Sequence, residues 1–265
     1  GVYFIPMLLR KFRSGPEAAA FDWAAIDALV PMGGVRVEDN ILVTPGGPRN
    51  LTSATTSSDN SVYAQLTCDV GPATVYEMAK KMGITTQVES DQYNIALGLG
   101  GLYDGVSVLD MARAYAPLAN GGYRVDLLPI TRLSRAGGKS RVFKPKRTKI
   151  LSDGVTAKVT EILRANVTGG TGGRANLSNV PVAGKTGTTD AATDVWFVGY
   201  TPKYVTAVWV GYPERRRSLG NQQGGRAPAT IWGEFMREAT KGESGQAFIT
   251  PKEAFVPTIS STYWT

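Results

Sequence analysis

The sequence predicts an α+β (mixed α/β) domain, because helical patterns precede and follow a β-rich region late in the chain. Residues 195–200 and 205–212 are rich in β-branched and aromatic residues, and residues 201–204 between them suit the turn of a hairpin. Residues 181–186 read as a strand that enters this hairpin. A chain of 265 residues with 42% hydrophobic composition can bury a large core. We therefore expect a single domain over residues 1–265, with helices packed on an antiparallel sheet.

Hydrophobic periodicity and capping residues predict four principal helices. Glycines follow the first two, and Ser152 is a good N-cap for the third. The apolar face of the fourth consists of Ile231, Trp232, Phe235 and Met236. The predicted bounds are residues 72–82, 106–120, 152–167 and 229–241.

Composition excludes several kinds of active site. The chain has no histidine, which excludes Ser-His-Asp and Cys-His mechanisms and most catalytic zinc sites. Its single cysteine, Cys68, cannot form an internal disulfide, and we expect it to be a small buried residue. Acid–base chemistry therefore has to use Lys, Asp, Glu, Tyr or Cys. We expect neither a cofactor nor a metal.

The formal net charge of +7 suits an anionic partner, although a basic surface also serves solubility alone. Basic residues cluster at residues 135–149 and 215–217, but no aromatic stacking platform is interleaved with them. We therefore do not expect nucleic acid as a partner.

A short string that begins at Lys185 carries the first chemical signal. It joins a cation, a glycine and three hydroxyls, as Lys185-Thr186-Gly187-Thr188-Thr189. On an edge strand this combination suits a carboxylate, because it offers charge-assisted hydrogen bonds and close backbone approach. Taken alone, the string is also compatible with a solvated turn.

A second motif strengthens the functional interpretation of the Lys185 string. Ser58-Asp59-Asn60 lies 127 residues before Lys185 and precedes the helical pattern of residues 62–66. Ser-x-x-Lys, Ser-Asp-Asn and Lys-Thr-Gly form the catalytic set of class A β-lactamases and penicillin-binding proteins. Two of the three motifs are present here, in the right order. For Asp59 itself, a turn role beside the motif is the simpler interpretation.

The chain also resembles one branch of that superfamily, the transpeptidase domain of bifunctional (class A) penicillin-binding proteins. The resemblance runs from Ser58 to about Met236 and includes strings that a β-lactamase is not expected to carry. These strings occupy residues 119–122, 168–172, 182–189, 194–202, 208–212 and 228–232.

The resemblance implies a five-stranded antiparallel sheet between helical layers, with an all-helical region beside it. The active site would lie between the two regions, at the edge strand that bears Lys185. The glycosyltransferase domain and the membrane anchor typical of this class are expected to be missing from this chain. The resemblance places the domain at the extracytoplasmic face of the bacterial cytoplasmic membrane, with membrane attachment only through that anchor.

The resemblance also implies roles for individual residues. Ser58 and Lys185 would be catalytic, relaying a proton to the leaving amine, and Asn60 would bind the acyl-side amide of the peptidoglycan stem peptide. Further substrate contacts would come from Thr186, Gly187, Thr188 and Thr189, whose hydroxyls and amides suit the terminal carboxylate of D-Ala-D-Ala or of a β-lactam. Cell-wall synthesis proteins are further expected partners.

The serine motif itself departs from the family pattern. Members read Gly-Ser-x-Phe-Lys-Pro, whereas this chain opens with Gly-Val-Tyr-Phe-Ile-Pro. In this register Val2 occupies the position of the nucleophilic serine, and Ile5 occupies the position of its lysine. Val2 lies 56 residues before Ser58. No serine in the chain is followed by lysine three positions later. Valine has no nucleophilic atom and isoleucine cannot take a proton.

Three hypotheses follow from this departure. The domain is an impaired D,D-transpeptidase that binds stem peptides and β-lactams without acylation, or a working transpeptidase seen through an altered N-terminus. Alternatively, it is a non-catalytic peptidoglycan-binding or protein-scaffold pseudoenzyme of the cell envelope. We expect residue 2 to begin a helix that points into the cleft, although Val2 and Ile5 also suit plain helix packing. Residues 50–57 are poor in helix formers where the family has a regular helix.

Overall fold

A computed structural model describes residues 41–44, 47–89, 93–102, 104–135 and 138–255. Contacts along the chain separate two compact units, Gly1–Ser53 and Ala54–Thr265. In the first unit, β1 (Ile41–Thr44) and β2 (Gly47–Asn50) pair antiparallel, with Ile41 opposite Asn50. The helix expected from residue 2, with Val2 and Ile5, lies outside the described residues. A single domain over residues 1–265 stays a prediction.

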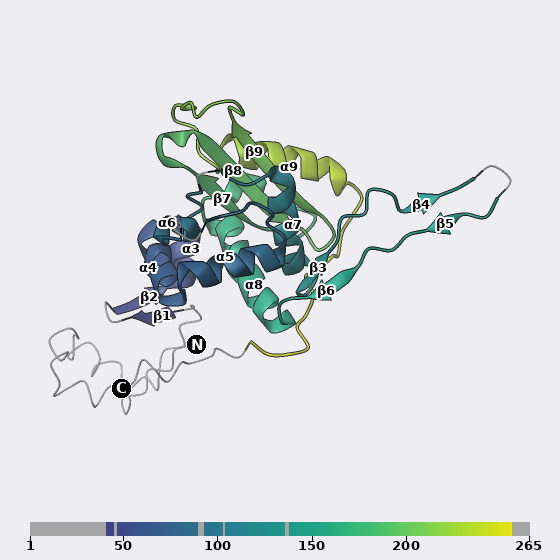
Figure 1. Ribbon diagram of the computed structural model, residues 1–265, viewed down its shortest axis with the longest axis horizontal. Helices are drawn as coiled ribbons and strands as arrows, with labels where there is room; N and C mark the ends of the chain where they lie inside the picture. The colour runs from purple at the N-terminus through teal and green to yellow at the C-terminus, as the bar shows by residue number, and fades with distance from the viewer. Residues whose placement is uncertain (1–40, 45–46, 90–92, 103, 136–137, 256–265) are drawn as a thin grey trace. The chain divides into compact units, whose positions relative to one another are not determined.

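A helical region begins around the second motif (Figure 1). Asp59 is the N-cap of the helix that follows Ser58, and its carboxylate accepts hydrogen bonds from the backbone N–H groups of Ser61 and Val62. The helix over residues 72–82 has the predicted bounds and ends at Gly83, whose φ of 125° favours glycine. The helices are α3 (Leu51–Ser57), α4 (Asn60–Val70), α5 (Pro72–Met82) and α6 (Ile95–Gly98).

Two expectations about this region are wrong. Residues 50–57 were expected to be poorly helical, but residues 51–57 form α3, because Ala54 and Thr55 are buried and tertiary contacts outweigh weak propensity. Cys68 is exposed rather than buried. It follows the buried Thr67, and successive helical residues point about 100° apart.

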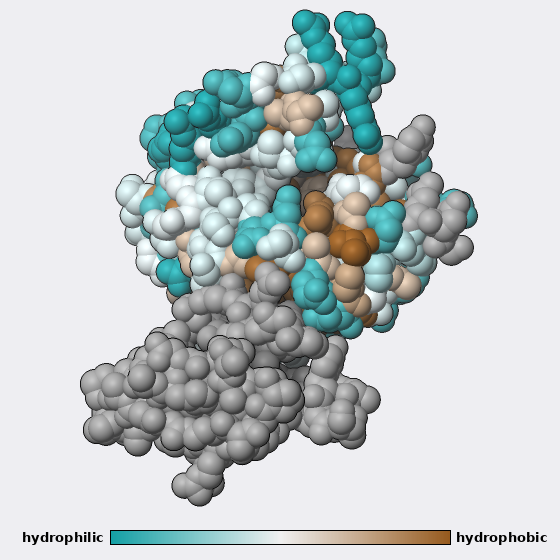
Figure 2. Space-filling view, turned by 90° about the vertical axis from the view of Figure 1, so that its left-hand side faces the viewer, coloured by the Kyte–Doolittle hydropathy of each residue, from teal (hydrophilic) through white to brown (hydrophobic). Residues whose placement is uncertain are grey.

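The outer surface of the helical region is partly hydrophobic. Ile95 and Leu99, at the two ends of α6, are exposed. Figure 2 views the molecule from the side on which α4 and α6 lie in Figure 1, and shows hydrophobic side chains gathered in a patch among hydrophilic ones. The helices that follow Ser58 therefore do not bury all of their apolar surface.

The central sheet comes from the predicted hairpin region. β7 (Ala183–Thr188), β8 (Asp194–Tyr200) and β9 (Val205–Gly211) are antiparallel in the order β7-β8-β9. Residue 185 lies opposite residue 198, and residue 197 opposite residue 208. The α+β prediction is confirmed, but the five-stranded sheet is not seen. In the part of the chain that the structure describes, this sheet has three strands, with β8 in the middle and β7 and β9 at its edges.

Smaller antiparallel pairs complete the second unit. β3 (Tyr123–Val125) pairs with β6 (Arg147–Lys149), and β4 (Arg132–Leu133) pairs with β5 (Arg141–Val142) in a hairpin that extends away from the helices and the sheet in Figure 1. Single 3₁₀ turns occur at η5 (Gly173–Ala175) and η6 (Asp190–Ala192).

Three longer helices cover the sheet. They are α7 (Val108–Ala119), capped by Ser107, α8 (Asp153–Gly169), capped by Ser152, and α9 (Ala227–Ala239). All three overlap the predicted ranges, with ends that differ by a few residues. Among the described residues, none of the helices combines the length and the apolar content that crossing a bilayer requires.

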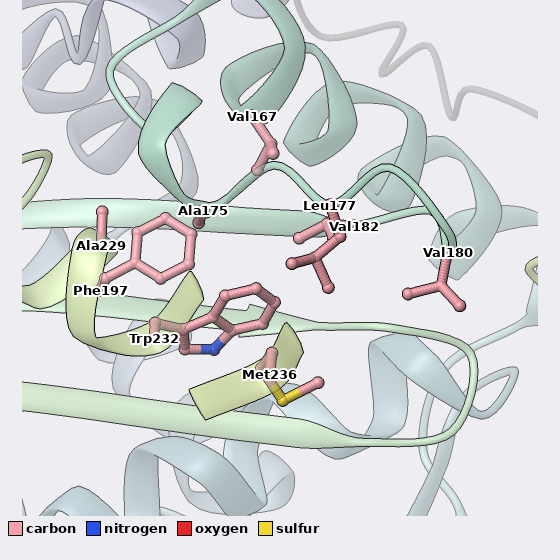
Figure 3. Packing of buried hydrophobic residues seen from close by; sticks show 9 residues of the cluster. All are labelled: Val167, Ala175, Leu177, Val180, Val182, Phe197, Ala229, Trp232 and Met236. Carbon is pink, nitrogen blue, oxygen red and sulfur yellow. The ribbon is translucent and has the colours of Figure 1, made fainter. Parts of the chain in front are cut away.

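The core lies on both faces of β8. On one face Phe197 meets Trp232 of α9 edge to face, with ring centroids 5.3 Å apart, and the Trp232 indole N–H donates to the Thr206 carbonyl at 2.9 Å. On the other face Tyr200 packs with residues of α7 and α8, and its hydroxyl lies 2.9 Å from Thr160 Oγ1. Figure 3 shows the first cluster: Val167, Ala175, Leu177, Val180, Val182, Phe197, Ala229, Trp232 and Met236. The sheet is therefore held between α9 and the pair α7 and α8.

The apolar face predicted for the last helix is only half right. Trp232 and Met236 are fully buried, whereas Ile231 is 46% exposed and Phe235 is 59% exposed. Each pair is separated by four residues and so lies along one side of the helix. α9 therefore buries one side against the sheet and leaves an adjacent side in solvent.

This contrast predicts unequal costs for two aromatic truncations on the same helix. Trp232→Ala should lower the free energy of unfolding by about 3–5 kcal/mol, because it opens a cavity in the core. Phe235→Ala, the matched control, should change it by about 0.5 kcal/mol or less, since the ring is mostly solvated. Urea denaturation followed by circular dichroism measures both values. Equal losses would contradict this packing.

Candidate active site

The candidate site is built on β7, which lies at the edge of the three-stranded sheet. Pairing with β8 uses one side of the strand, and alternation along it gives neighbouring side chains different surroundings. Thr186 is buried, Lys185 and Gly187 are half-buried, and Thr188 is exposed. The strand therefore presents a partly sheltered cation beside hydroxyls.

The structure brings Lys185 and Ser58 together. The Lys185 ammonium donates to Ser58 Oγ at 2.8 Å, although the two residues are 127 positions apart. It also donates to the Thr186 carbonyl at 3.0 Å and lies 3.3 Å from Thr186 Oγ1. The two motifs therefore meet in the folded chain, and these contacts hold the ammonium at one point of the strand.

Burial changes the acid–base behaviour of this lysine. Desolvation lowers the pKa of Lys185 from its usual value of 10.5 to about 8. The ammonium form still dominates at neutral pH, but the neutral amine is much more accessible than for a solvated lysine. The group can therefore bind an anion and also exchange a proton near physiological pH.

Ser58 is held in an unusual backbone conformation. Its φ is 59°, in the left-handed region that favours glycine. The Ser58 N–H donates to the Thr55 carbonyl at 3.3 Å and the Asp59 N–H to the Ala54 carbonyl at 2.8 Å, which is the Schellman pattern that ends a helix. The end of α3 thus presents the Ser58 hydroxyl, and the strain is tolerated because this turn also begins α4.

A glycine that the sequence analysis did not single out supports the other end of the strand. The Gly224 N–H donates to Thr188 Oγ1 at 3.0 Å, so the hydroxyl hydrogen of Thr188 remains available to a ligand. A Cβ on Gly224 would lie 2.3 Å from the Trp196 carbonyl oxygen and 2.6 Å from that of Gly187. Only glycine permits this approach, and the sequence shows only a Gly-Gly pair here, without the strand that it meets.

The sequence also did not identify Thr171 and Asn166, which lie behind the strand, as site residues. Thr171 Oγ1 lies 2.6 Å from Thr186 Oγ1, and the side-chain amide of Asn166 donates to Thr171 Oγ1 at 3.0 Å. Thr171 belongs to a string quoted for the family resemblance, but nothing in the sequence separates Asn166 from the other polar residues of its helix. Only the packing of α8 against β7 brings it behind the site.

For the remaining predicted site residues, Asn60 and Thr189, the described part of the chain shows no hydrogen bond to Lys185 or Ser58. Asn60 is the first residue of α4 and is exposed, and among the described residues no hydrogen bond involves its side chain. The Thr189 hydroxyl closes the turn after β7, accepting from the Asp194 N–H at 2.9 Å and lying 2.9 Å from Thr193 Oγ1. Substrate contacts by Asn60 and Thr189 stay predictions.

The backbone of Ser58 generates a stability prediction. Ser58→Gly should be more stable than Ser58→Ala by about 1 kcal/mol, because glycine adopts this φ without the steric cost that a Cβ brings. Both variants lose the hydroxyl, so their difference reports the backbone alone. Urea denaturation at pH 7 measures it, and an Ala variant as stable as the Gly variant would show that the left-handed turn is not kept in solution.

Comparison with known proteins agrees with this geometry. The family described as "Penicillin binding protein transpeptidase domain" matches residues 38–237. Penicillin-binding protein 2D of Bacillus subtilis is 32% identical over 216 residues, which cover 77% of this chain and 30% of that protein. Penicillin-binding protein 1A of Aquifex aeolicus is 34% identical over 216 residues, covering 81% of this chain and 29% of that protein. The chain thus spans about a third of the length of these relatives.

Solved structures are similar as well. The penicillin-binding protein PonA1 of Mycobacterium tuberculosis aligns with a TM-score of 0.66 and 28% identity, covering 83% of this chain and 68% of that one, and has also been solved in complex with penicillin V. Penicillin-binding protein 1A of Haemophilus influenzae aligns with a TM-score of 0.69 over 82% of this chain and 40% of that one; at 21% identity it supports the fold alone. The family match, the relatives and the fold agree that this chain belongs to the penicillin-binding protein transpeptidase domain family.

Proposed function

We propose that this domain binds the terminal carboxylate of D-Ala-D-Ala stem peptides and of β-lactams, as a transpeptidase domain of peptidoglycan synthesis whose acyl transfer is impaired in this sequence. The observation that carries the proposal is the contact of Lys185 with Ser58, beside the hydroxyls of Thr186 and Thr188 on an edge strand. This grouping joins a cation and hydroxyl donors on a strand that is the outer one of its sheet among the described residues.

Carboxylate recognition follows from the chemistry of these groups. An ammonium and hydroxyls form short, charge-assisted hydrogen bonds with a carboxylate. Thr188 Oγ1 accepts from the Gly224 N–H, so its hydrogen remains available to a ligand. An extended peptide can also pair with the open edge of β7, which orients its carboxyl end along the strand. We propose Gly187 and Thr189 as parts of the same binding segment.

Ser58 and Lys185 form the proposed proton relay. Because the ammonium donates to Ser58 Oγ, the hydrogen of Ser58 is left to donate to a leaving amine, and Lys185 can replace it. The lowered pKa of Lys185 brings this exchange close to neutral pH. Asn60, two residues after Ser58, is proposed to bind the acyl-side amide of the stem peptide.

Acylation needs a further group. The family reaction begins with attack by a serine that a lysine three residues later activates, and the 265 residues contain no such pair. Our register places Val2 and Ile5 at these two positions. Without a nucleophile the remaining groups can bind and orient a substrate but cannot form an acyl-enzyme. Binding and acyl transfer are therefore separable in this chain.

The setting of the domain is part of the proposal. Stem peptides are assembled into the wall outside the cytoplasmic membrane, so we propose that the domain works at the extracytoplasmic face. Cell-wall synthesis proteins are proposed partners.

One prediction from the proposed function concerns covalent labelling. Incubation with a fluorescent penicillin or with benzylpenicillin should add no covalent mass to this chain, because no hydroxyl stands at the acylation position. Intact-mass spectrometry after prolonged incubation measures this. A gain of one β-lactam mapped to Ser58 would contradict impaired acylation and would show that this serine has become the nucleophile.

A matched variant tests whether the rest of the site is competent. The double substitution Val2→Ser with Ile5→Lys restores the family pattern and should become acylated by benzylpenicillin. The same double variant carrying Lys185→Ala is the control and should stay largely unmodified. A double variant that folds and still stays unmodified would place a further defect elsewhere in the domain.

A further prediction concerns pH. Non-covalent binding of benzylpenicilloate, a β-lactam product with the same carboxylate, should weaken by roughly tenfold per pH unit above about pH 8, where Lys185 loses its charge. Below that pH the affinity should be nearly constant down to about pH 6. Isothermal titration calorimetry measures the profile. Lys185→Arg is the control, since its cation does not titrate in this range, and an equally steep profile in that variant would assign the effect to another group.

A further inference from the structure

A buried amide joins the two halves of the candidate site. Asn166 lies near the end of α8 and is fully buried. Its side-chain NH₂ group donates to the Thr55 carbonyl at 3.1 Å, to the Thr56 carbonyl at 3.3 Å and to Thr171 Oγ1 at 3.0 Å. Two hydrogens are shared among three acceptors, so one of these bonds is bifurcated.

The first two acceptors fix the end of α3. Thr55 and Thr56 are within the last turn of that helix. The Thr56 carbonyl also accepts from the Thr171 N–H at 3.1 Å. The amide of Asn166 thus holds the backbone that immediately precedes Ser58, and with it the left-handed turn that aims the Ser58 hydroxyl.

The third acceptor leads to the strand. Because Thr171 Oγ1 already accepts from Asn166, its own hydrogen is free to donate to Thr186 Oγ1, 2.6 Å away. Lys185 lies 3.3 Å from the same Thr186 oxygen. If Thr171 is the donor, the hydroxyl hydrogen of Thr186 remains available to a ligand. Asn166 therefore reaches Ser58 through one set of bonds and Thr186 through another.

We propose that Asn166 is a positioning residue that sets Ser58 against Lys185 and orients the hydroxyl of Thr186 toward the substrate carboxylate. Packing alone does not account for an amide here, since Asn166 Oδ1 is buried and has no hydrogen-bond partner in the described part of the chain. That orphaned oxygen costs stability, whereas the donor side makes three hydrogen bonds that an apolar residue could not make. The substrate part of this inference rests on the proposed function; the positioning part does not.

The chain contains a matched control for this residue. Asn179 uses its side-chain NH₂ in the same way, donating to the Thr240 carbonyl at 2.9 Å, to Thr240 Oγ1 at 3.2 Å and to the Glu243 carbonyl at 3.2 Å. None of these acceptors touches the candidate site residues. Asn166→Leu and Asn179→Leu therefore remove equivalent sets of hydrogen bonds, and only the first lies behind the site.

The experiment measures geometry at the site without a ligand. The pKa of Lys185 is followed by NMR titration of ¹³C-labelled lysine side chains, together with the amide signals of Ser58 and Asp59. In Asn166→Leu the end of α3 should move and water should reach the ammonium, so the pKa of Lys185 should rise by about one unit. The two amide signals should shift as well. Asn179→Leu should leave the pKa and the amide signals as in the unsubstituted chain.

A second pair of variants covers the case in which Asn166→Leu does not fold. Thr171→Val removes the hydroxyl that links Asn166 to Thr186 while keeping the shape of the side chain, and should reproduce part of the change. Thr171→Ser keeps the hydroxyl and should restore the original values. Unchanged Lys185 and Ser58 signals in whichever of Asn166→Leu and Thr171→Val folds would overturn the proposal, as would equal changes in Asn179→Leu.

Ligand binding then separates this inference from the proposed function. Site signals that respond as expected, together with no binding of benzylpenicilloate by the unsubstituted chain, would support positioning and refute carboxylate recognition. Binding by the unsubstituted chain that Asn166→Leu leaves unchanged would refute the orientation of Thr186. Binding that falls at least about tenfold in Asn166→Leu, but not in Asn179→Leu, supports both.

Discussion

The antiparallel pairing of β7 with β8 is the constraint on which the rest of the structure depends. β8 carries core residues on both faces, with Phe197 against α9 and Tyr200 against α7 and α8, so its position is fixed by packing. Pairing with β8 transfers that rigidity to β7 while leaving its other side at the sheet edge. A strand held in this way can present Lys185 and its neighbouring hydroxyls to a ligand without first having to be ordered.

The core and the site share the same helix. Val167 of α8 is buried in the cluster around Trp232, while the preceding residue, Asn166, turns its amide toward α3 and the strand. Two consecutive residues of α8 thus lie in different surroundings, Val167 in hydrophobic packing and Asn166 in a hydrogen-bonded network. Because α8 is anchored by the first set of contacts, it can hold the second set in register. The geometry of the candidate site is therefore a product of core packing as much as of the motifs themselves.

The proposed binding of a carboxylate and the proposed loss of acyl transfer depend on different groups of the site. Partial burial of Lys185 makes its charge more effective toward a carboxylate and brings its pKa within reach of neutral pH. Neither property needs a nucleophile. Ser58, Thr186 and Thr188 contribute hydroxyls, whereas acyl transfer requires a Ser-x-x-Lys pair that the sequence does not contain. The proposed carboxylate binding therefore does not depend on the proposed loss of acyl transfer.

The sequence by itself determined the fold class, the main helices, the β7–β9 strands and the two motifs, because periodicity, caps and short strings are local properties. It could not supply the three-stranded extent of the described sheet, the helical state of residues 51–57 or the exposure of Cys68, since these depend on neighbours distant in sequence. The roles of Asn166 and Gly224 were decided by tertiary structure alone. Their chemistry arises from carbonyls and a strand that only folding brings within hydrogen-bond distance, and no pattern of adjacent residues encodes that meeting.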